Sequence, residues 1–162
     1  MKDKIDFVVT WVDDSDSNWQ SKRNQHSNVK SKSNVAKTTF REWGAFRYWF
    51  QGVEKNAPWV NKIYLVTDHQ SPKWLNKNNN KIALVNHDDY IHKDTLPTFN
   101  TNAITARMHK IPGLSNKFVY FNDDMYILNP VKPTDFLKVG YRVIWLYTNQ
   151  LHLIKMEQPI FK

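Results

Sequence analysis

The sequence has no cysteine among its 162 residues. This absence excludes disulfide scaffolds, thiolate zinc sites and cysteine nucleophiles. Two glycine-rich signatures are also missing: the Gly-x-x-x-x-Gly-Lys phosphate-binding loop and the Gly-x-Gly-x-x-Gly dinucleotide fingerprint. If the protein binds a phosphorylated ligand, another group must therefore neutralise the phosphates.

Long hydrophobic runs are absent too. The longest uninterrupted apolar run is five residues, Val143-Ile144-Trp145-Leu146-Tyr147, whereas a bilayer-spanning helix needs about 20 apolar residues. The first residues are followed neither by an apolar segment of signal-peptide length nor by a small-residue cleavage site. We therefore expect no transmembrane helix and a cytoplasmic location.

The composition predicts one folded, basic domain. Hydrophobic residues make up 41% of the chain and aromatic residues 14%, which is enough for a core. The net charge is +8, and several cations lie in the polar segment 17–39, which we interpret as a solvated basic loop: Lys22, Arg23, Lys30, Lys32 and Lys37. Binding of anions, including anionic lipid at the inner face of the membrane, is the alternative interpretation. No recognition motif supports nucleic-acid binding.

Hydrophobic patterning predicts alternating strands and helices. Four short runs of β-branched and aromatic residues predict strands, over residues 5–12, 62–67, 81–85 and 117–121. A Thr39-x-x-Glu42 capping box precedes a helical pattern that extends to Asn56, and a second helix is predicted from Asn100, as its cap, to Ile111. This order indicates an α/β fold with a mainly parallel sheet and flanking helices.

Acidic residues cluster where two of the predicted strands end. These clusters are Asp13-Asp14-x-Asp16 and Asp123-Asp124. Ligands of open α/β sheets bind outside the carboxyl ends of the strands, and clustered carboxylates there suit a hard divalent cation, Mg²⁺ or Mn²⁺, that carries phosphate oxygens. The alternative is that these aspartates are solvated turn residues.

Eight segments of the sequence resemble the conserved blocks of the Stealth family of sugar-phosphate transferases. They are DFVVTWVD (6–13, with Asp16), FREWGAFRY (40–48), VEKNAPWV (53–60), IYLVTD (63–68), PKWL (72–75), LPTFNTNAI (96–104), HKIPGL (109–114) and FVYFNDDM (118–125). Together they cover roughly residues 5–135, far more than a short motif reaches by chance.

The resemblance implies a nucleotide-sugar-transferase-like fold and a phosphoryl transfer. In such a reaction a sugar 1-phosphate passes from a nucleotide sugar, such as a UDP-hexosamine, to a hydroxyl of a glycan or lipid-linked glycan in capsule or exopolysaccharide synthesis. It also implies site residues: Asp123 and Asp124 for the metal, and Asp6, Thr10, Trp11, Asp13 and Asp16 for the nucleotide-sugar pocket.

Four further residues are candidates with structural alternatives. Arg47 is placed to hold a phosphate, unless it is a surface cation of an amphipathic helix. His109 is a candidate for proton transfer, and a cation favoured at a helix C-terminus is its alternative. Thr98 and Asn100 are candidates to bind the sugar, although Asn100 is also a sufficient helix cap.

The sequence departs from the family pattern after residue 136. Residues 137–162 resemble none of the family's later blocks, so we interpret 1–136 as the nucleotide-sugar-binding part and 137–162 as a divergent or truncated tail that leaves the fold incomplete at the C-terminus. Two other functions stay open. One is a metal-dependent glycosyltransferase, which releases a nucleoside diphosphate instead of a monophosphate. The other is an inactive remnant that only binds the donor.

Overall fold

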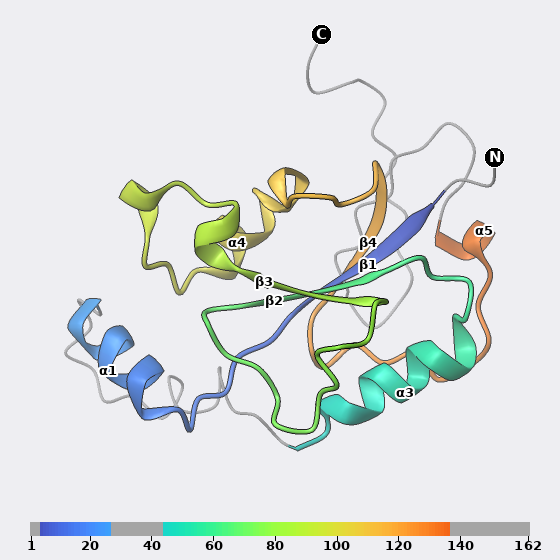
Figure 1. Ribbon diagram of the computed structural model, residues 1–162, viewed down its shortest axis with the longest axis horizontal. Helices are drawn as coiled ribbons and strands as arrows, with labels where there is room; N and C mark the ends of the chain where they lie inside the picture. The colour runs from blue at the N-terminus through green and yellow to red at the C-terminus, as the bar shows by residue number, and fades with distance from the viewer. Residues whose placement is uncertain (1–3, 27–43, 137–162) are drawn as a thin grey trace, which may run out of the picture.

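Four parallel strands form one sheet in the order β3-β2-β1-β4, with helices on both faces (Figure 1). The computed structural model describes residues 4–26 and 44–136. The strands are β1 (Ile5–Thr10), β2 (Ile63–Thr67), β3 (Ile82–Asn86) and β4 (Lys117–Phe121). The prediction of an α/β fold with a parallel sheet and flanking helices is therefore confirmed.

The α-helices are α1 (Ser17–His26), α3 (Phe46–Asn56), α4 (Thr101–Thr105) and α5 (Pro133–Phe136). Three single 3₁₀ turns, η1 (His87–Asp89), η2 (Lys93–Thr95) and η3 (Met108–Lys110), lie between β3 and β4. Within the described ranges 4–26 and 44–136, no helix has the length and apolar character needed to cross a bilayer.

The sheet is buried on both faces, which explains why its strands read as continuous apolar runs. The core on the α3 face includes Phe7, Val9, Leu65, Trp49, Val53 and Phe121. The core on the opposite face, beneath α4 and η3, includes Val8, Val66, Val85, Ile104 and Met108. Successive residues of β1 therefore alternate between two separate cores, as a pleated strand requires.

The predicted strands agree with the observed ones to within two residues, and the helices differ more. The helix expected up to Asn56 is present as α3, but its predicted capping box, Thr39 to Glu42, lies outside the described residues. The second predicted helix is interrupted: α4 ends at Thr105, and η3 follows as a separate turn. The Asn100 cap is confirmed, because its side chain accepts a hydrogen bond from the Asn102 N–H at 2.9 Å.

The interpretation of residues 17–39 as a solvated loop is wrong for its first part, which forms α1. Asp16 caps this helix by accepting hydrogen bonds from the backbone N–H groups of Asn18 and Trp19, at 2.8 and 3.0 Å. Trp19 is buried, and both carboxylate oxygens of Asp68 accept from Lys22 Nζ at 2.7 Å. The segment is too polar to show an apolar helical pattern, and its helix is stabilised by these tertiary contacts. The remaining basic positions 30, 32 and 37 lie outside the described residues, as does the tail 137–162.

Asp6 lies at the edge of the sheet opposite to the strand carboxyl ends. Its carboxylate is fully buried and accepts hydrogen bonds from Asn61 Nδ2 at 2.6 Å and from the Ser115 N–H at 2.8 Å. Asn61 precedes β2 and Ser115 precedes β4, so Asp6 connects the amino ends of three strands. Thr10, at the other end of β1, is four residues away, or roughly 13 Å at about 3.3 Å per residue. This position gives Asp6 a structural role and separates it from the other residues expected in the donor pocket.

Replacing Asp6 with alanine should destabilise the fold without weakening donor binding. We expect Asp6→Ala to lower the free energy of unfolding by about 2–4 kcal/mol, because the variant loses two hydrogen bonds to a buried carboxylate. Urea unfolding measures this loss, and calorimetric titration with a UDP-amino sugar measures donor affinity. A stable Asp6→Ala protein that has lost donor affinity would instead place Asp6 in the pocket.

Loss of the Asp16 cap should weaken α1. Asp16→Ala should destabilise the protein by about 1 kcal/mol near neutral pH, whereas Asp16→Ser, which also caps, should be close to wild type. The hydrogen bond from the Trp19 N–H lowers the pKa of Asp16 below its ordinary value of 3.8. The capping contribution is therefore present above that value and disappears as the pH falls through the lowered pKa. Unfolding curves of both variants between neutral and acidic pH check this, and a constant difference across that range would contradict it.

Candidate functional site

The topological switch point of the sheet lies between β1 and β4. From β1 the chain adds β2 and β3 on one side and then returns to place β4 on the other side. In open α/β sheets the crevice outside the strand carboxyl ends at such a point is the usual ligand site. Val9 pairs with Phe121 in this register, so Thr10 and Asn122 are the next residues of the two strands at this edge.

A short polar network connects the ends of β1 and β4. Thr10 Oγ1 and the Tyr120 hydroxyl are 3.1 Å apart, and that hydroxyl donates a hydrogen bond to Asn122 Oδ1. Burial raises the pKa of Tyr120, and the negative charges of Asp123 and Asp124 raise it further, against an opposing effect of the Thr10 hydrogen bond. Tyr120 is therefore a protonated hydrogen-bond donor at neutral pH. The effect of Asp123 and Asp124 on its pKa also means that the acidic pair lies near Tyr120, and so near Thr10 at the switch point.

Trp11 and Asp13 follow β1 at the same edge. The indole of Trp11 is buried and stacks on Phe46, with ring centroids 5.8 Å apart, and its buried Nε1 has no hydrogen-bond partner among the residues that the structure describes. Asp13 Oδ1 accepts from the backbone N–H and hydroxyl of Ser15, at 2.9 and 2.6 Å. Its backbone N–H and C=O form two hydrogen bonds, each of 2.9 Å, with the side-chain amide of Gln70. Asp16 caps α1, as described above.

Four other predicted residues form no hydrogen bond with the described residues of this network. Arg47 is exposed at the start of α3, with its guanidinium 5.5 Å from the centroid of the Tyr48 ring, and His109 is exposed in η3. Neither side chain forms a hydrogen bond or ion pair with another described residue. Thr98 Oγ1 accepts from the Asn100 N–H at 3.3 Å, and Asn100 caps α4. The structural alternatives thus account for the positions of Arg47 and Asn100.

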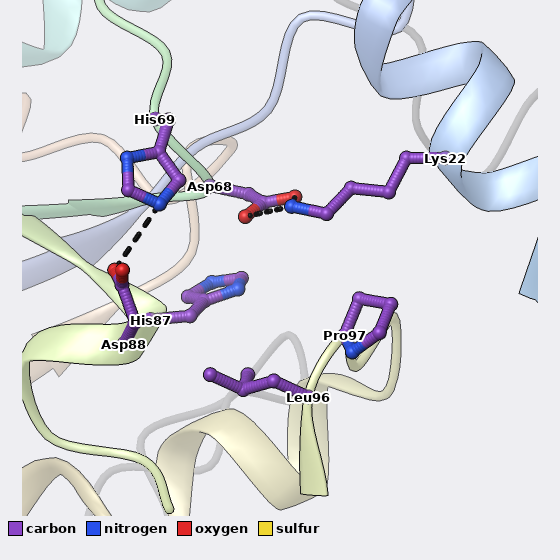
Figure 2. Close-up of a pocket in the computed structure, with 7 residues that line it drawn as sticks. All are labelled: Lys22, Asp68, His69, His87, Asp88, Leu96 and Pro97. Carbon is purple, nitrogen blue, oxygen red and sulfur yellow. Dashed lines mark hydrogen bonds and ion pairs between the residues drawn. The ribbon is translucent and has the colours of Figure 1, made fainter. Parts of the chain in front are cut away.

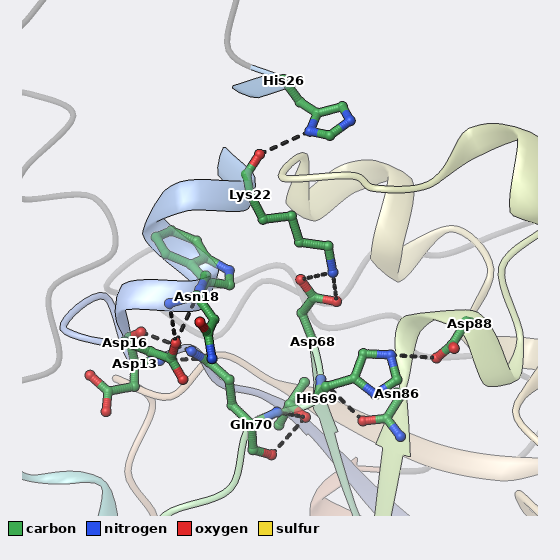
Figure 3. A network of polar contacts seen from close by, with 12 residues as sticks. Asp13, Asp16, Asn18, Lys22, His26, Asp68, His69, Gln70, Asn86 and Asp88 are labelled. Carbon is green, nitrogen blue, oxygen red and sulfur yellow. Dashed lines mark hydrogen bonds and ion pairs between the residues drawn. The ribbon is translucent and has the colours of Figure 1, made fainter. Parts of the chain in front are cut away.

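A pocket that the sequence analysis missed lies at the carboxyl ends of β2 and β3, beside α1 (Figure 2). It has a volume of about 220 Å³ and is lined by Lys22, Asp68, His69, His87, Asp88, Leu96 and Pro97. Lys22 reaches from α1 to bind Asp68, and Gln70, two residues further on, hydrogen-bonds to the backbone of Asp13 (Figure 3). One feature of the sequence points to this pocket: Asp68 and the His87-Asp88 pair each follow a predicted strand.

Two histidines, His69 and His87, line this pocket. His69 has a positive φ of 59°, uncommon for a residue other than glycine. Its Nε2 lies 3.2 Å from Asp88 Oδ1, and its backbone N–H donates to Asn86 Oδ1 at 3.2 Å. His87 is half-buried, and its ring nitrogens have no hydrogen-bond partner among the described residues. Burial lowers the pKa of His87, and the Asp68 carboxylate opposes this effect, so the imidazole is neutral at neutral pH.

Two carboxylates that could hold a metal lie at the other end of this edge. Among the residues described, no group of three or more His, Asp or Glu side chains is arranged to hold a metal ion. Mg²⁺ is commonly held by one or two carboxylates and completed by substrate phosphates and water. Asp123 and Asp124 therefore fit an ion that binds together with a phosphorylated substrate.

The protonation of His87 can be tested directly. We expect its ring to titrate below the ordinary histidine pKa of 6.5 in an NMR experiment. The neutral form is favoured in the folded state, so its contribution to stability is present above that value and is lost as the pH falls through the lowered pKa. His87→Gln should therefore lose less stability than wild type between about pH 7 and pH 5. His109→Gln, at an exposed position, is the control, and a His87 resonance that titrates at or above 6.5 would contradict the expectation.

The sequence matches two family models. Residues 39–143 match Stealth protein CR2, conserved region 2, and residues 3–28 match Stealth protein CR1, conserved region 1. The chain is 56% identical over 137 residues to the receptor polysaccharide phosphotransferase WefC of Streptococcus oralis, covering 82% of this chain and 41% of the relative. It is 55% identical to the capsular polysaccharide phosphotransferase WcwK of Streptococcus pneumoniae, with the same coverage.

A third relative extends the comparison to another genus. The exopolysaccharide phosphotransferase cps2G of Lactiplantibacillus plantarum is 50% identical over 132 residues, which are 82% of this chain and 39% of that protein. The chain thus spans about two fifths of the length of these curated relatives. The family models cover both the β1–α1 segment and the segment from α3 to β4, and so both ends of the site. The chain belongs to the Stealth protein family.

Proposed function

We propose that this chain contributes the donor-binding part of a transferase that moves a sugar 1-phosphate from a nucleotide sugar to a glycan hydroxyl. Its relatives are named as phosphotransferases of capsular, receptor and exopolysaccharides. The single observation that carries the proposal is the acidic pair Asp123-Asp124 beside the switch point, next to the network of Thr10, Tyr120 and Asn122.

The proposed role of Asp123 and Asp124 is to hold Mg²⁺ or Mn²⁺. Both carboxylates are hard oxygen ligands of the kind that these ions prefer. When bound, the ion would neutralise charge on the donor's phosphates. The Thr10 and Tyr120 hydroxyls and the Asn122 amide lie beside the pair and would hydrogen-bond to the donor's sugar or phosphate oxygens.

The reaction that we propose is a displacement at phosphorus. The acceptor hydroxyl oxygen forms a bond to the β-phosphorus of the nucleotide sugar and gives up its proton. The bond from that phosphorus to the oxygen bridging the two phosphates breaks, and the nucleoside monophosphate leaves with the electron pair. Positioning and charge stabilisation supply most of the catalysis in reactions of this type. We propose a glycan or lipid-linked glycan as the acceptor, reached at the cytoplasmic face of the membrane.

Removing the acidic pair should abolish metal-dependent donor binding. We expect wild-type protein to bind a UDP-amino sugar more tightly with Mg²⁺ or Mn²⁺ than without, and Asp123→Asn/Asp124→Asn to lose that difference. Calorimetric titration measures both affinities. The matched control is Asp94→Asn/Asp135→Asn, which removes the same charge at exposed positions. Metal-dependent binding that survives in the acidic-pair variant would overturn the assignment.

Product analysis distinguishes the two remaining alternatives. Sugar-phosphate transfer releases a nucleoside monophosphate, whereas a metal-dependent glycosyltransferase with the same acidic pair releases a nucleoside diphosphate. Incubation of the chain with donor and a glycan acceptor, followed by chromatography of the nucleotides, decides between them. A protein that binds donor in a metal-dependent way but releases neither nucleotide is a donor-binding unit without turnover.

A further inference from the structure

The pocket at the ends of β2 and β3 offers hydrogen-bonding groups on one side and an apolar wall on the other (Figure 2). Lys22 Nζ and the Asp68 carboxylate lie side by side, a donor next to an acceptor. The imidazole of His87 faces the same space with both nitrogens unpartnered by any described residue. Leu96 and Pro97 form the opposite, apolar side. This combination suits a small ring that has a polar edge and apolar faces.

The charges of the lining argue against a phosphate in this pocket. The one lysine is balanced by Asp68, and Asp88 adds a second carboxylate. His87 is held neutral by its burial. Because the fixed charges are two negative and one positive, a doubly charged phosphate would be repelled rather than held. The ligand that fits is an uncharged ring whose edge both donates and accepts hydrogen bonds.

The distance of the pocket from the acidic pair indicates which part of a nucleotide sugar it would bind: the base and not the sugar. The acidic pair follows β4, which lies two strand spacings from β2 and three from β3. At about 4.8 Å for each spacing, the pocket is roughly 10–14 Å from the acidic pair across the sheet. In the proposed reaction the sugar is bonded directly to the reacting phosphorus and must lie close to the acidic pair. The base is separated from that phosphorus by a ribose and a second phosphate, which matches the greater separation.

We propose that this pocket binds the heterocyclic base of the nucleotide donor. Asp68 accepts from a ring or amino N–H of the base, Lys22 donates to a carbonyl or ring nitrogen, and His87 contacts the ring. The proposal rests on the proposed function, because it takes the donor to be a nucleotide sugar with its phosphates near Asp123 and Asp124. The base is then recognised at the ends of β2 and β3 and not by Trp11 and Asp13, which follow β1.

The test compares a nucleotide with its base-free equivalent, on the full chain and without metal. UMP, CMP, AMP and GMP are titrated in parallel with ribose 5-phosphate, and backbone amide shifts are followed by NMR. We expect at least one nucleotide to bind about tenfold or more tightly than ribose 5-phosphate. Its shift changes should concentrate at residues 68–70 and 86–88. Shift changes confined to residues 10–13 and 122–124, or equal affinity for ribose 5-phosphate, would overturn the proposal.

Two pocket variants and one control locate the base. Asp68→Ala removes the acceptor, and Leu96→Trp fills the pocket without touching the ion pair, so the proposal stays testable if the first variant folds poorly. We expect each to weaken nucleotide binding about tenfold or more, with a cooperative unfolding transition retained. Asp94→Ala, an exposed carboxylate outside the pocket, should bind as wild type does. Folded pocket variants with wild-type affinity would refute base binding here.

Failure of this inference and failure of the proposed function give different results. In Asp123→Asn/Asp124→Asn, metal-free nucleotide binding at the pocket should persist while the metal-dependent gain with a UDP-amino sugar is lost. If the pocket variants bind nucleotide normally but the acidic-pair variant loses metal-dependent binding, the base pocket is wrong and the donor site stands. If nucleotide binds at the pocket and metal has no effect on donor affinity, the base pocket stands and the proposed metal site at Asp123 and Asp124 is wrong.

Discussion

The parallel pairing of β1 with both β2 and β4 is the constraint on which the rest of the structure depends. Because β1 is central and parallel to both neighbours, every strand ends at the same edge, and every loop that follows a strand begins there. At the opposite edge the buried carboxylate of Asp6 connects the amino ends of the same three strands, through Asn61 and Ser115. The register that Asp6 helps to set at one edge therefore fixes how the strand ends align at the other.

The strands were predictable because two-sided burial leaves a local signature. Each is a short run of β-branched and aromatic residues, and β4 was predicted with its observed bounds, Lys117–Phe121. Helix α1 leaves no such signature, since Trp19 is the one buried residue among its ten. It depends instead on the Asp16 cap and on the contact between Lys22 and Asp68, which are 46 residues apart. No local pattern reveals a contact of that separation.

The difference between local patterns and contacts of distant residues also explains which parts of the candidate site could be predicted. The position of Asp123-Asp124 at the sheet edge follows from a strand prediction alone, because the pair comes directly after β4. The pocket beside β2 and β3 requires knowing that these strands are neighbours and that α1 reaches across to them. The family resemblance assigned Asp6 and Asp16 to the nucleotide-sugar pocket, and in the structure Asp6 is a buried link between strands and Asp16 is a helix cap.

The two ends of the proposed donor site are held together by the segment that follows β1. Gln70, after β2, makes two hydrogen bonds with the backbone of Asp13, after β1. Asp16 then starts α1, and Lys22 of that helix returns to Asp68 at the end of β2. The segment after β1 is thus connected twice to the loop after β2, once through Asp13 and Gln70 and once through Lys22 and Asp68, which line the pocket. A donor that spans both ends would meet a separation set in advance by these bonds, so that less of its binding energy is needed to position the phosphates for reaction.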